Sequence, residues 1–484
     1  MKTNRVIKIF LASSEELEAD RYRFGNLIRK LDNIYEKRGI RIELFEWEDY
    51  DAAYNGMRKQ DEYNERVRAS DMFLALFHKK AGKFTIEEFN IARKAFDEQA
   101  SPKIYTYIKD LEAGESESRE LAEFKRLMLE ELGHYWCRYS NFDTMQLHFV
   151  LQLQMVEATT PIKVEVKESQ VKIGDSTIAD LNNVPFTSEN ATHRELQSRK
   201  EQLDREIGNA ESGGRRGFFG QRSRMTDEEL ANLREERESV TEQIERQEKA
   251  LVDTAMSIAR MQGGECSPRM RTAAELFEKG EIDKAGAVLK EDDMEADATN
   301  AKLKFDTAAQ PTAELTRNIE RCAGEYMLKA RIVVSGIADE SRYRQAVKLM
   351  STAIDLVSGR LPEETLAEYL FDYAVLLTDV GQQTKALETW ERLSGIYERL
   401  YRKAPQKYAY GYAGVLNNMA VLYSDKGDFD HCLSKYLKAV DIYDRLDREG
   451  PGIYDDDIAR LKNNLGTLYS DRDEYNLSLI HISE

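Results

Sequence analysis

The chain contains 484 residues, of which 41% are apolar and 33% are charged. One hydrophobic core seldom organises a chain of this length, so we expect about two to four domains. The formal net charge of −18 argues against nucleic acid as a partner, because phosphate binding requires a positive surface.

Cysteine usage and hydropathy exclude further classes of protein. The cysteines are scattered and lack CxxC spacing, which indicates neither a disulfide framework nor a metal site; they are Cys137, Cys266, Cys322 and Cys432. Lys8 interrupts the apolar start of the chain, which favours a first strand over a signal peptide. No stretch approaches the roughly 18 apolar residues of a membrane span. We therefore expect a cytoplasmic protein without a membrane span.

Residues 1–158 alternate strand-like and helix-like segments. The expected strands are 5–11, 40–48, 71–77, 103–109 and 134–140. This alternation predicts an α/β domain with a flavodoxin-like parallel sheet and helices on both faces. Ligands of such sheets bind beyond the carboxyl ends of the strands. Residues 12–15, 47–50 and 78–88 are therefore expected on one rim.

The expected rim carries side chains suited to a nucleotide. The candidate nucleotide-binding residues are Ala12, Ser13, Ser14, Trp47, Tyr50, His78, Lys79 and Phe84. Serine hydroxyls and the N–H groups of a helix start suit a diphosphate. Cationic side chains after the third strand would meet phosphate oxygens, and an aromatic ring after the second strand would stack on a base.

Several of these residues also have a structural interpretation. Ser13 and Glu16 match a helix capping box. His78 and its two lysine neighbours match a solvated charge run. Trp47 and Tyr50 are equally suited to packing against a helix, and Phe84 to filling the core side of its loop.

Two adjacent carboxylates follow the third expected strand, in the segment "GKFTIEEFNIA" (82–92). Successive residues of a helix point about 100° apart, so Glu87 and Glu88 do not both face the rim. Glu88 lies one turn before Ala92 and is expected on the sheet side, which makes it the candidate catalytic residue. A capping box of Thr85 with Glu88, in a helix that starts at about Thr85, is the structural alternative.

The element order, the "FLASS" segment (10–14) and this glutamate resemble the TIR (Toll/interleukin-1 receptor) superfamily, in its divergent bacterial branch. The family pattern S-x-W-C-x-x-E falls on Gly82, Phe84, Thr85 and Glu88. The aromatic residue and the acid match in kind, whereas the serine and the cysteine do not. Catalytic members cleave NAD and depend on self-association, while other members are adaptors. The resemblance implies Glu88 as the catalytic residue, NAD as substrate without a further cofactor, and a homo-oligomer when active.

Two smaller elements are expected after this domain. Residues 159–189 read as a small β element with a turn at Gly174-Asp175, and residues 190–264 as an antiparallel helical hairpin whose second arm starts with a Thr226–Glu229 capping box. The hairpin tip, 213–224, is glycine-rich and basic. It suits either an acidic partner or membrane surface, or a solvated loop.

Residues 268–484 are expected to form an all-α repeat solenoid. Small residues recur at a constant spacing: Ala374, Ala420 and Gly466; Gly381 and Gly427; Ala386, Cys432 and Ser478. Residues 273–289 read as a diverged earlier copy. The pattern resembles tetratricopeptide repeats with longer helices, which implies a protein or peptide partner. The ending "SLIHISE" reads as adaptor-derived sequence, so we expect a longer natural protein.

Two functions remain open from the sequence. The first is an NAD-cleaving, TIR-like effector that is controlled by self-association and by the repeats, with a role in anti-phage defence by analogy. The second is a non-catalytic, TIR-like adaptor or scaffold that binds protein partners through the repeats.

Overall fold

The computed structural model describes residues 5–37, 39–46, 59–132, 136–156, 164–212, 226–261, 266–336, 339–449 and 454–471. The chain divides into two compact units. The first comprises Met1–Leu153 with Lys172–Asn183, and the second comprises Gln154–Val171 with Val184–Glu484.

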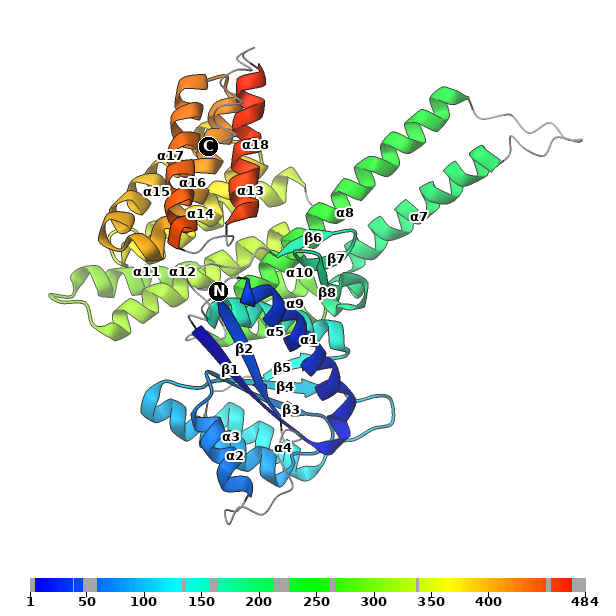
Figure 1. The fold of residues 1–484 in the computed structure, drawn as a ribbon, viewed down its shortest axis with the longest axis vertical. Coiled ribbons are helices and arrows are strands. Elements are labelled where there is room, and N and C mark those ends of the chain that lie inside the picture. The colour runs from blue at the N-terminus through cyan, green and yellow to red at the C-terminus, as the bar shows by residue number, and fades with distance from the viewer. Residues whose placement is uncertain are drawn as a thin grey trace, which may run out of the picture. The chain divides into compact units, whose positions relative to one another are not determined.

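The first unit contains a parallel sheet of five strands (Figure 1). The strands are β1 Arg5–Ser13, β2 Ile40–Phe45, β3 Met72–Phe77, β4 Lys103–Lys109 and β5 Trp136–Tyr139. Their order is β2-β1-β3-β4-β5, which is the order of flavodoxin-like doubly wound sheets. Every residue of β3 is buried, as a central strand covered on both faces requires. The parallel α/β sheet predicted from the sequence is confirmed.

Helices cover both faces of this sheet. They are α1 Glu18–Glu36, α2 Lys59–Arg68, α3 Lys83–Gln99, α4 Arg119–Arg126 and α5 Phe142–Val156. On one face α1 and α5 meet through an edge-to-face contact of Phe24 with Phe149, whose ring centroids are 4.8 Å apart. On the other face Val67 of α2, Phe89 of α3 and Phe124 of α4 share a core with the sheet.

Three short strands form a second sheet, in the order β6-β7-β8. They are β6 Glu165–Lys167, β7 Gln170–Ile173 and β8 Ser176–Asp180. The turn that the sequence predicted at Gly174-Asp175 connects β7 and β8, and Gly174 has a φ of +54°.

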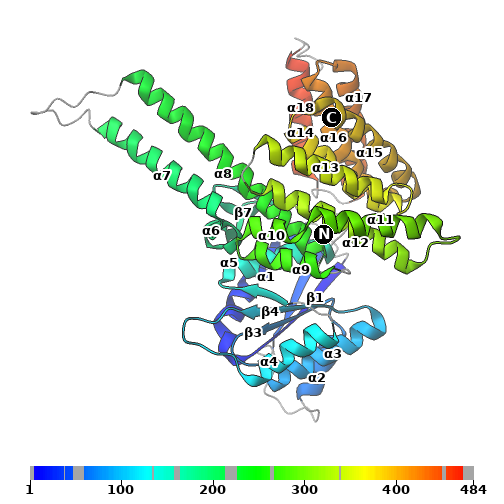
Figure 2. The ribbon, with the colours of Figure 1, turned by 180° about the vertical axis from the view of Figure 1, so that it is seen from behind.

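The long arms α7 Ala191–Ser212 and α8 Asp227–Met261 follow the short helix α6 Pro185–Ser188 and lie side by side (Figure 2). Leu203, Val240 and Ile244 form the apolar seam between the arms. The predicted capping box is present at the start of α8. The Thr226 N–H donates to Glu229 Oε2 over 2.7 Å, and the Glu229 N–H donates to Thr226 Oγ1 over 3.1 Å. The predicted tip, 213–224, lies outside the described residues.

The remainder of the second unit is helical. Its helices are α9 Pro268–Glu278, α10 Ile282–Val288, α11 Glu291–Thr307, α12 Ala313–Val334, α13 Glu340–Val357, α14 Glu363–Asp379, α15 Gln383–Lys403, α16 Pro405–Asp425, α17 Phe429–Glu449 and α18 Asp455–Asp471. From α11 to α18 each helix packs on the next one in the chain. None of the described helices combines the length and the apolar character that crossing a membrane requires.

Three turns between these helices share one backbone structure. Gly280, Gly381 and Gly427 have φ angles of +77°, +71° and +71°. In each turn the glycine N–H donates to the carbonyl three residues earlier, and the next N–H donates to the carbonyl five residues earlier. This is the Schellman motif, which favours glycine in the left-handed region. Gly381 and Gly427 lie 427 − 381 = 46 residues apart, so the structure repeats at the spacing seen in the sequence.

Four of the other repeated positions are buried, whereas Gly466 of α18 is half-buried and Ser478 lies outside the described residues. Ala374 of α14 and Ala420 of α16 are completely buried, as are Ala386 of α15 and Cys432 of α17. A larger side chain at these positions would force neighbouring helices apart. At these four positions the small residues therefore have the packing role that the sequence predicted.

Replacing the turn glycines by alanine should separate backbone strain from steric overlap. At Gly381 and Gly427 an added Cβ has open space, so only the left-handed conformation costs free energy, about 1 kcal/mol. At Gly280 the Cβ would also lie 2.7 Å from the carbonyl oxygen of Pro185, which raises the cost to about 3 kcal/mol. Urea denaturation followed by circular dichroism measures the difference, and equal losses at all three positions would contradict it.

Candidate functional site

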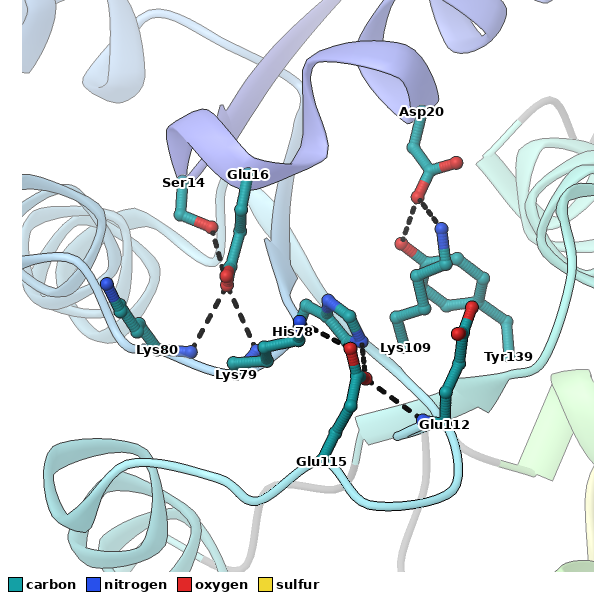
Figure 3. Close-up of polar contacts among 10 residues, drawn as sticks. All are labelled: Ser14, Glu16, Asp20, His78, Lys79, Lys80, Lys109, Glu112, Glu115 and Tyr139. Carbon is teal, nitrogen blue, oxygen red and sulfur yellow. Dashed lines mark hydrogen bonds and ion pairs between the residues drawn. The ribbon is translucent and has the colours of Figure 1, made fainter.

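The candidate site lies where β1 and β3 end. These strands are neighbours, with Ser13 aligned with Leu76, and their following helices α1 and α3 cover opposite faces of the sheet. Neighbouring strands whose connections leave toward opposite faces create a crevice, which is where ligands of doubly wound sheets bind. Figure 3 shows the polar residues of this rim.

Glu16 connects the segments that follow β1 and β3. Its Oε1 accepts the N–H of Lys79 over 3.0 Å and the N–H of Lys80 over 3.2 Å. The hydroxyl of Ser14 donates to the same oxygen over 3.3 Å (Figure 3). The predicted capping box of Ser13 with Glu16 is therefore wrong: α1 begins at Glu18 without a side-chain cap, and the Glu16 carboxylate binds amides of another loop.

A buried guanidinium fixes the loop after β1. Arg21 Nη1 donates to Ser13 Oγ over 2.8 Å and to the carbonyl oxygen of Ser14 over 2.9 Å. Because Arg21 is almost completely buried in α1, it holds the two serines at the end of the strand. The Ser14 hydroxyl points to Glu16, while the Ser13 hydroxyl is engaged by Arg21.

The loop after β4 reaches the same place through Glu115. Its carboxylate forms an ion pair with Lys79 and accepts the N–H of Glu112 over 3.0 Å. His78 Nε2 lies 3.3 Å from Glu115 Oε2, without the alignment of a hydrogen bond. The hydrogen bonds from Lys79 and from the Glu112 N–H hold the pKa of Glu115 below its ordinary value, and Glu115 raises the pKa of Lys79.

The ion pair of Glu115 with Lys79 makes the stability of the loop after β4 depend on pH. Because the folded-state pKa of Glu115 is lowered, its stabilising contribution is present above the unfolded pKa near 4.5 and is lost as the pH falls through the folded value. At pH 7 we expect Glu115→Gln to accelerate amide exchange at Ser118, whose N–H donates to the Lys79 carbonyl oxygen. The effect should be small because the pair is partly exposed, and it should vanish in acid. Equal exchange of both proteins at pH 7, measured by mass spectrometry, would refute this role.

A second polar cluster joins β4, β5 and α1. The buried carboxylate of Asp20 forms an ion pair with Lys109 over 2.8 Å and accepts the hydroxyl of Tyr139 over 3.2 Å. Burial, with the adjacent Asp20 charge, raises the pKa of Tyr139, so its hydroxyl remains a donor at neutral pH. The cluster compensates a buried charge and fixes the start of α1 against the strand ends.

Glu88 is buried on the inner face of α3, with 8% of its surface exposed. The helix begins at Lys83 after Gly82, which has extended backbone angles and provides no side-chain cap. The predicted capping box of Thr85 with Glu88 is therefore wrong, because Thr85 lies inside the helix and is itself buried. Glu88 takes part in a polar or electrostatic interaction and is not an isolated charge.

The remaining predicted residues differ in their positions. Ala12 lies inside β1 and its side chain belongs to the core, so it presents only backbone near the rim. Phe84 is 60% exposed, which corrects the expectation that it fills the core side of its loop. The earlier helix start turns this ring outward. Trp47 and Tyr50 lie outside the described residues.

The structure thus brings Ser14 and Lys79 together through two residues that were not predicted as site residues, Glu16 and Glu115. Glu16 was assigned to a local cap, and its true partner is 63 residues away in sequence. Glu115 lies in an acidic loop whose composition resembles that of any solvated loop. Neither residue has a sequence signal that distinguishes it from its acidic neighbours.

Comparison with known proteins does not assign a family. No protein-family model and no curated protein matches the chain. Among solved structures, BtubC (BKLC) from P. vanneervenii is 14% identical, with 60% of this chain and 88% of that chain covered and a TM-score of 0.31. A Signal Transduction ATPase with Numerous Domains (STAND) protein with a tetratricopeptide repeat sensor, from Pyrococcus horikoshii, is 11% identical, with 99% and 90% covered and a TM-score of 0.23.

Proposed function

We propose that the N-terminal α/β domain binds NAD at the β1/β3 crevice and cleaves its nicotinamide–ribose bond, with Glu88 as the catalytic carboxylate. The observation that carries this proposal is the position of Glu88. It is a buried carboxylate near the start of the helix that directly follows β3, a strand of the crevice. Charge interactions are strongest in such a water-poor position.

The chemistry requires only one acidic residue. The nicotinamide of NAD carries a positive charge and leaves as a neutral ring, so no general acid has to protonate it, unlike in ordinary glycoside hydrolysis with two carboxylates. A carboxylate orients the ribose hydroxyls and stabilises the oxocarbenium-like transition state. In hydrolysis, water forms the new bond to the anomeric carbon as the carbon–nitrogen bond breaks, and one proton passes to the solvent.

The other rim residues would bind the rest of the substrate. The N–H groups of Lys79 and Lys80, with the hydroxyl of Ser14, converge on one point and suit a diphosphate oxygen. The Lys79 and Lys80 side chains supply positive charge beside them, and the His78 ring lies in the same segment next to Glu115. These groups support a nucleotide as the ligand.

We further propose that the helical repeats bind a protein or peptide and thereby control self-association of the enzyme. Stacked helix pairs such as α14 to α17 usually present a concave surface to a partner. The resemblance to the TIR superfamily supports a cytoplasmic effector that depletes NAD in anti-phage defence; this biological role rests on analogy.

A non-catalytic adaptor is the second candidate, and one observation favours it. The donors of the rim are already satisfied by Glu16 and Glu115 of the same chain. A rim stabilised in this way suits a domain that only recruits partners.

Nicotinamide release from NAD by concentrated full-length protein separates the two candidates. The enzyme proposal expects release that rises with forced clustering, for example by fusion to an oligomerising tag. Absence of release in the clustered state, by protein with an intact fold, would leave the adaptor.

A further inference from the structure

Three hydrogen-bond donors converge on Oε1 of Glu16 and form a local anion site within the fold. Two of these donors are consecutive backbone N–H groups, at Lys79 and Lys80, and the third is the Ser14 hydroxyl. Consecutive N–H groups that converge on one point form a nest, which binds anionic oxygens. The site is occupied by a carboxylate of the same chain (Figure 3).

The donors that Glu16 occupies lie where a ligand of this sheet would bind. The donors come from the ends of β1 and β3, the two strands between which a ligand of this sheet type binds. A phosphate group that entered the crevice would meet the same N–H groups. The Glu16 carboxylate and an incoming phosphate therefore compete for one set of donors.

The Glu16 side chain is also placed so that it can leave these donors. Its side chain is exposed, so its charge is screened by solvent and its hydrogen bonds contribute little to stability. Glu16 lies in a short 3-10 turn, Glu15–Leu17, and is outside the regular part of α1. Rotation of one exposed side chain is enough to vacate the donors, with no change of the backbone.

We infer that Glu16 is an internal competitor for phosphate: its carboxylate occupies the Lys79–Lys80 amide site, and a phosphate-bearing nucleotide binds only by displacing it. This inference rests on the proposed function for the identity of the nucleotide, and it adds a regulatory element to that site. Occupancy of the amide site by Glu16 lowers the affinity of the resting domain for the nucleotide. Any change that withdraws the segment after β1 would raise that affinity.

The test compares ADP binding by full-length proteins in isothermal titration calorimetry. ADP carries the diphosphate and has no nicotinamide, so it is not a substrate for the proposed cleavage. Glu16→Ala should bind ADP several-fold more tightly than the wild type, because a charged hydrogen-bonding competitor is removed. Glu18→Ala is the matched control: it removes an exposed charge two residues away that makes no contact with these amides, and it should leave the affinity unchanged.

Glu16→Gln is the second variant, in case Glu16→Ala fails to fold. Its amide oxygen still accepts the two N–H groups but lacks the charge, so ADP affinity should lie between those of the wild type and Glu16→Ala. Equal ADP affinity in the wild type and both Glu16 variants, including no binding by any of them, would overturn the inference that Glu16 competes with phosphate. A gain in ADP affinity in Glu18→Ala equal to that in Glu16→Ala would also overturn it. Nicotinamide release is measured separately. NAD cleavage without a gain in ADP affinity in Glu16→Ala overturns only the competition by Glu16, and a gain in ADP affinity without NAD cleavage overturns only the proposed enzyme activity.

Discussion

Glu88→Gln is expected to lower nicotinamide release by at least about a hundredfold, the loss typical of removing one group that stabilises a transition state. Glutamine has the same size and retains a hydrogen-bonding oxygen, but it carries no negative charge to stabilise an oxocarbenium-like ribose. Because Glu88 is buried, solvent does not replace the missing charge. The helix start should not suffer, since Glu88 is not part of a cap.

Glu87→Gln provides the matched control for this prediction. Glu87 is the adjacent residue of α3, and it is half-buried and points about 100° away from Glu88. We expect this variant to retain activity within a few-fold of the wild type. Circular dichroism melting curves establish that both variants fold. If the two substitutions reduce nicotinamide release equally, Glu88 has no special role in the chemistry.

Glu248→Ala should lower the stability of the second unit by about 3 kcal/mol. Glu248 of α8 has 0% of its surface exposed, and its Oε1 accepts the hydroxyl of Ser169 over 2.7 Å. The same oxygen lies 2.9 Å from Nε2 of His193, which is buried at the start of α7. Alanine would leave the buried His193 ring and the half-buried Ser169 hydroxyl without this acceptor, and it would release the turn after β6 from the base of the hairpin.

The isosteric variant Glu248→Gln should cost less, about 1 kcal/mol, because one acceptor oxygen remains. Glu245→Ala removes a carboxylate one turn earlier from the exposed face of α8 and should change stability by less than about 0.5 kcal/mol. Urea denaturation, with circular dichroism as the probe, ranks the three variants. A loss in Glu248→Ala no greater than in Glu245→Ala would show that the buried pair does not stabilise the hairpin.

Local sequence rules predicted much of the fold because several elements are determined locally. The Thr226–Glu229 capping box forms as predicted, at a helix start where only its own residues compete for the first N–H groups. The turn glycines Gly381 and Gly427 were found because their left-handed backbone is unfavourable for other residues. The strands were recognised as apolar segments between helices.

The same capping rule failed twice in the α/β domain, for reasons of tertiary structure. Glu16 has the spacing of a cap, but the parallel sheet brings two N–H groups of another loop within its reach. Thr85 also has the spacing of a cap, but α3 starts earlier and buries its side chain. Contacts between strand ends depend on the order of the sheet, which a capping pattern does not encode. The candidate site was therefore predictable as a region and not as a set of contacts.

The most direct test of the central claim is a crystal structure of Glu88→Gln with NAD, since this variant should bind the substrate without cleaving it. We predict that the nicotinamide riboside contacts residue 88, and that a diphosphate oxygen replaces the Glu16 carboxylate on the N–H groups of Lys79 and Lys80. NAD bound away from the ends of β1 and β3, or with its ribose remote from residue 88, would contradict the proposed enzyme.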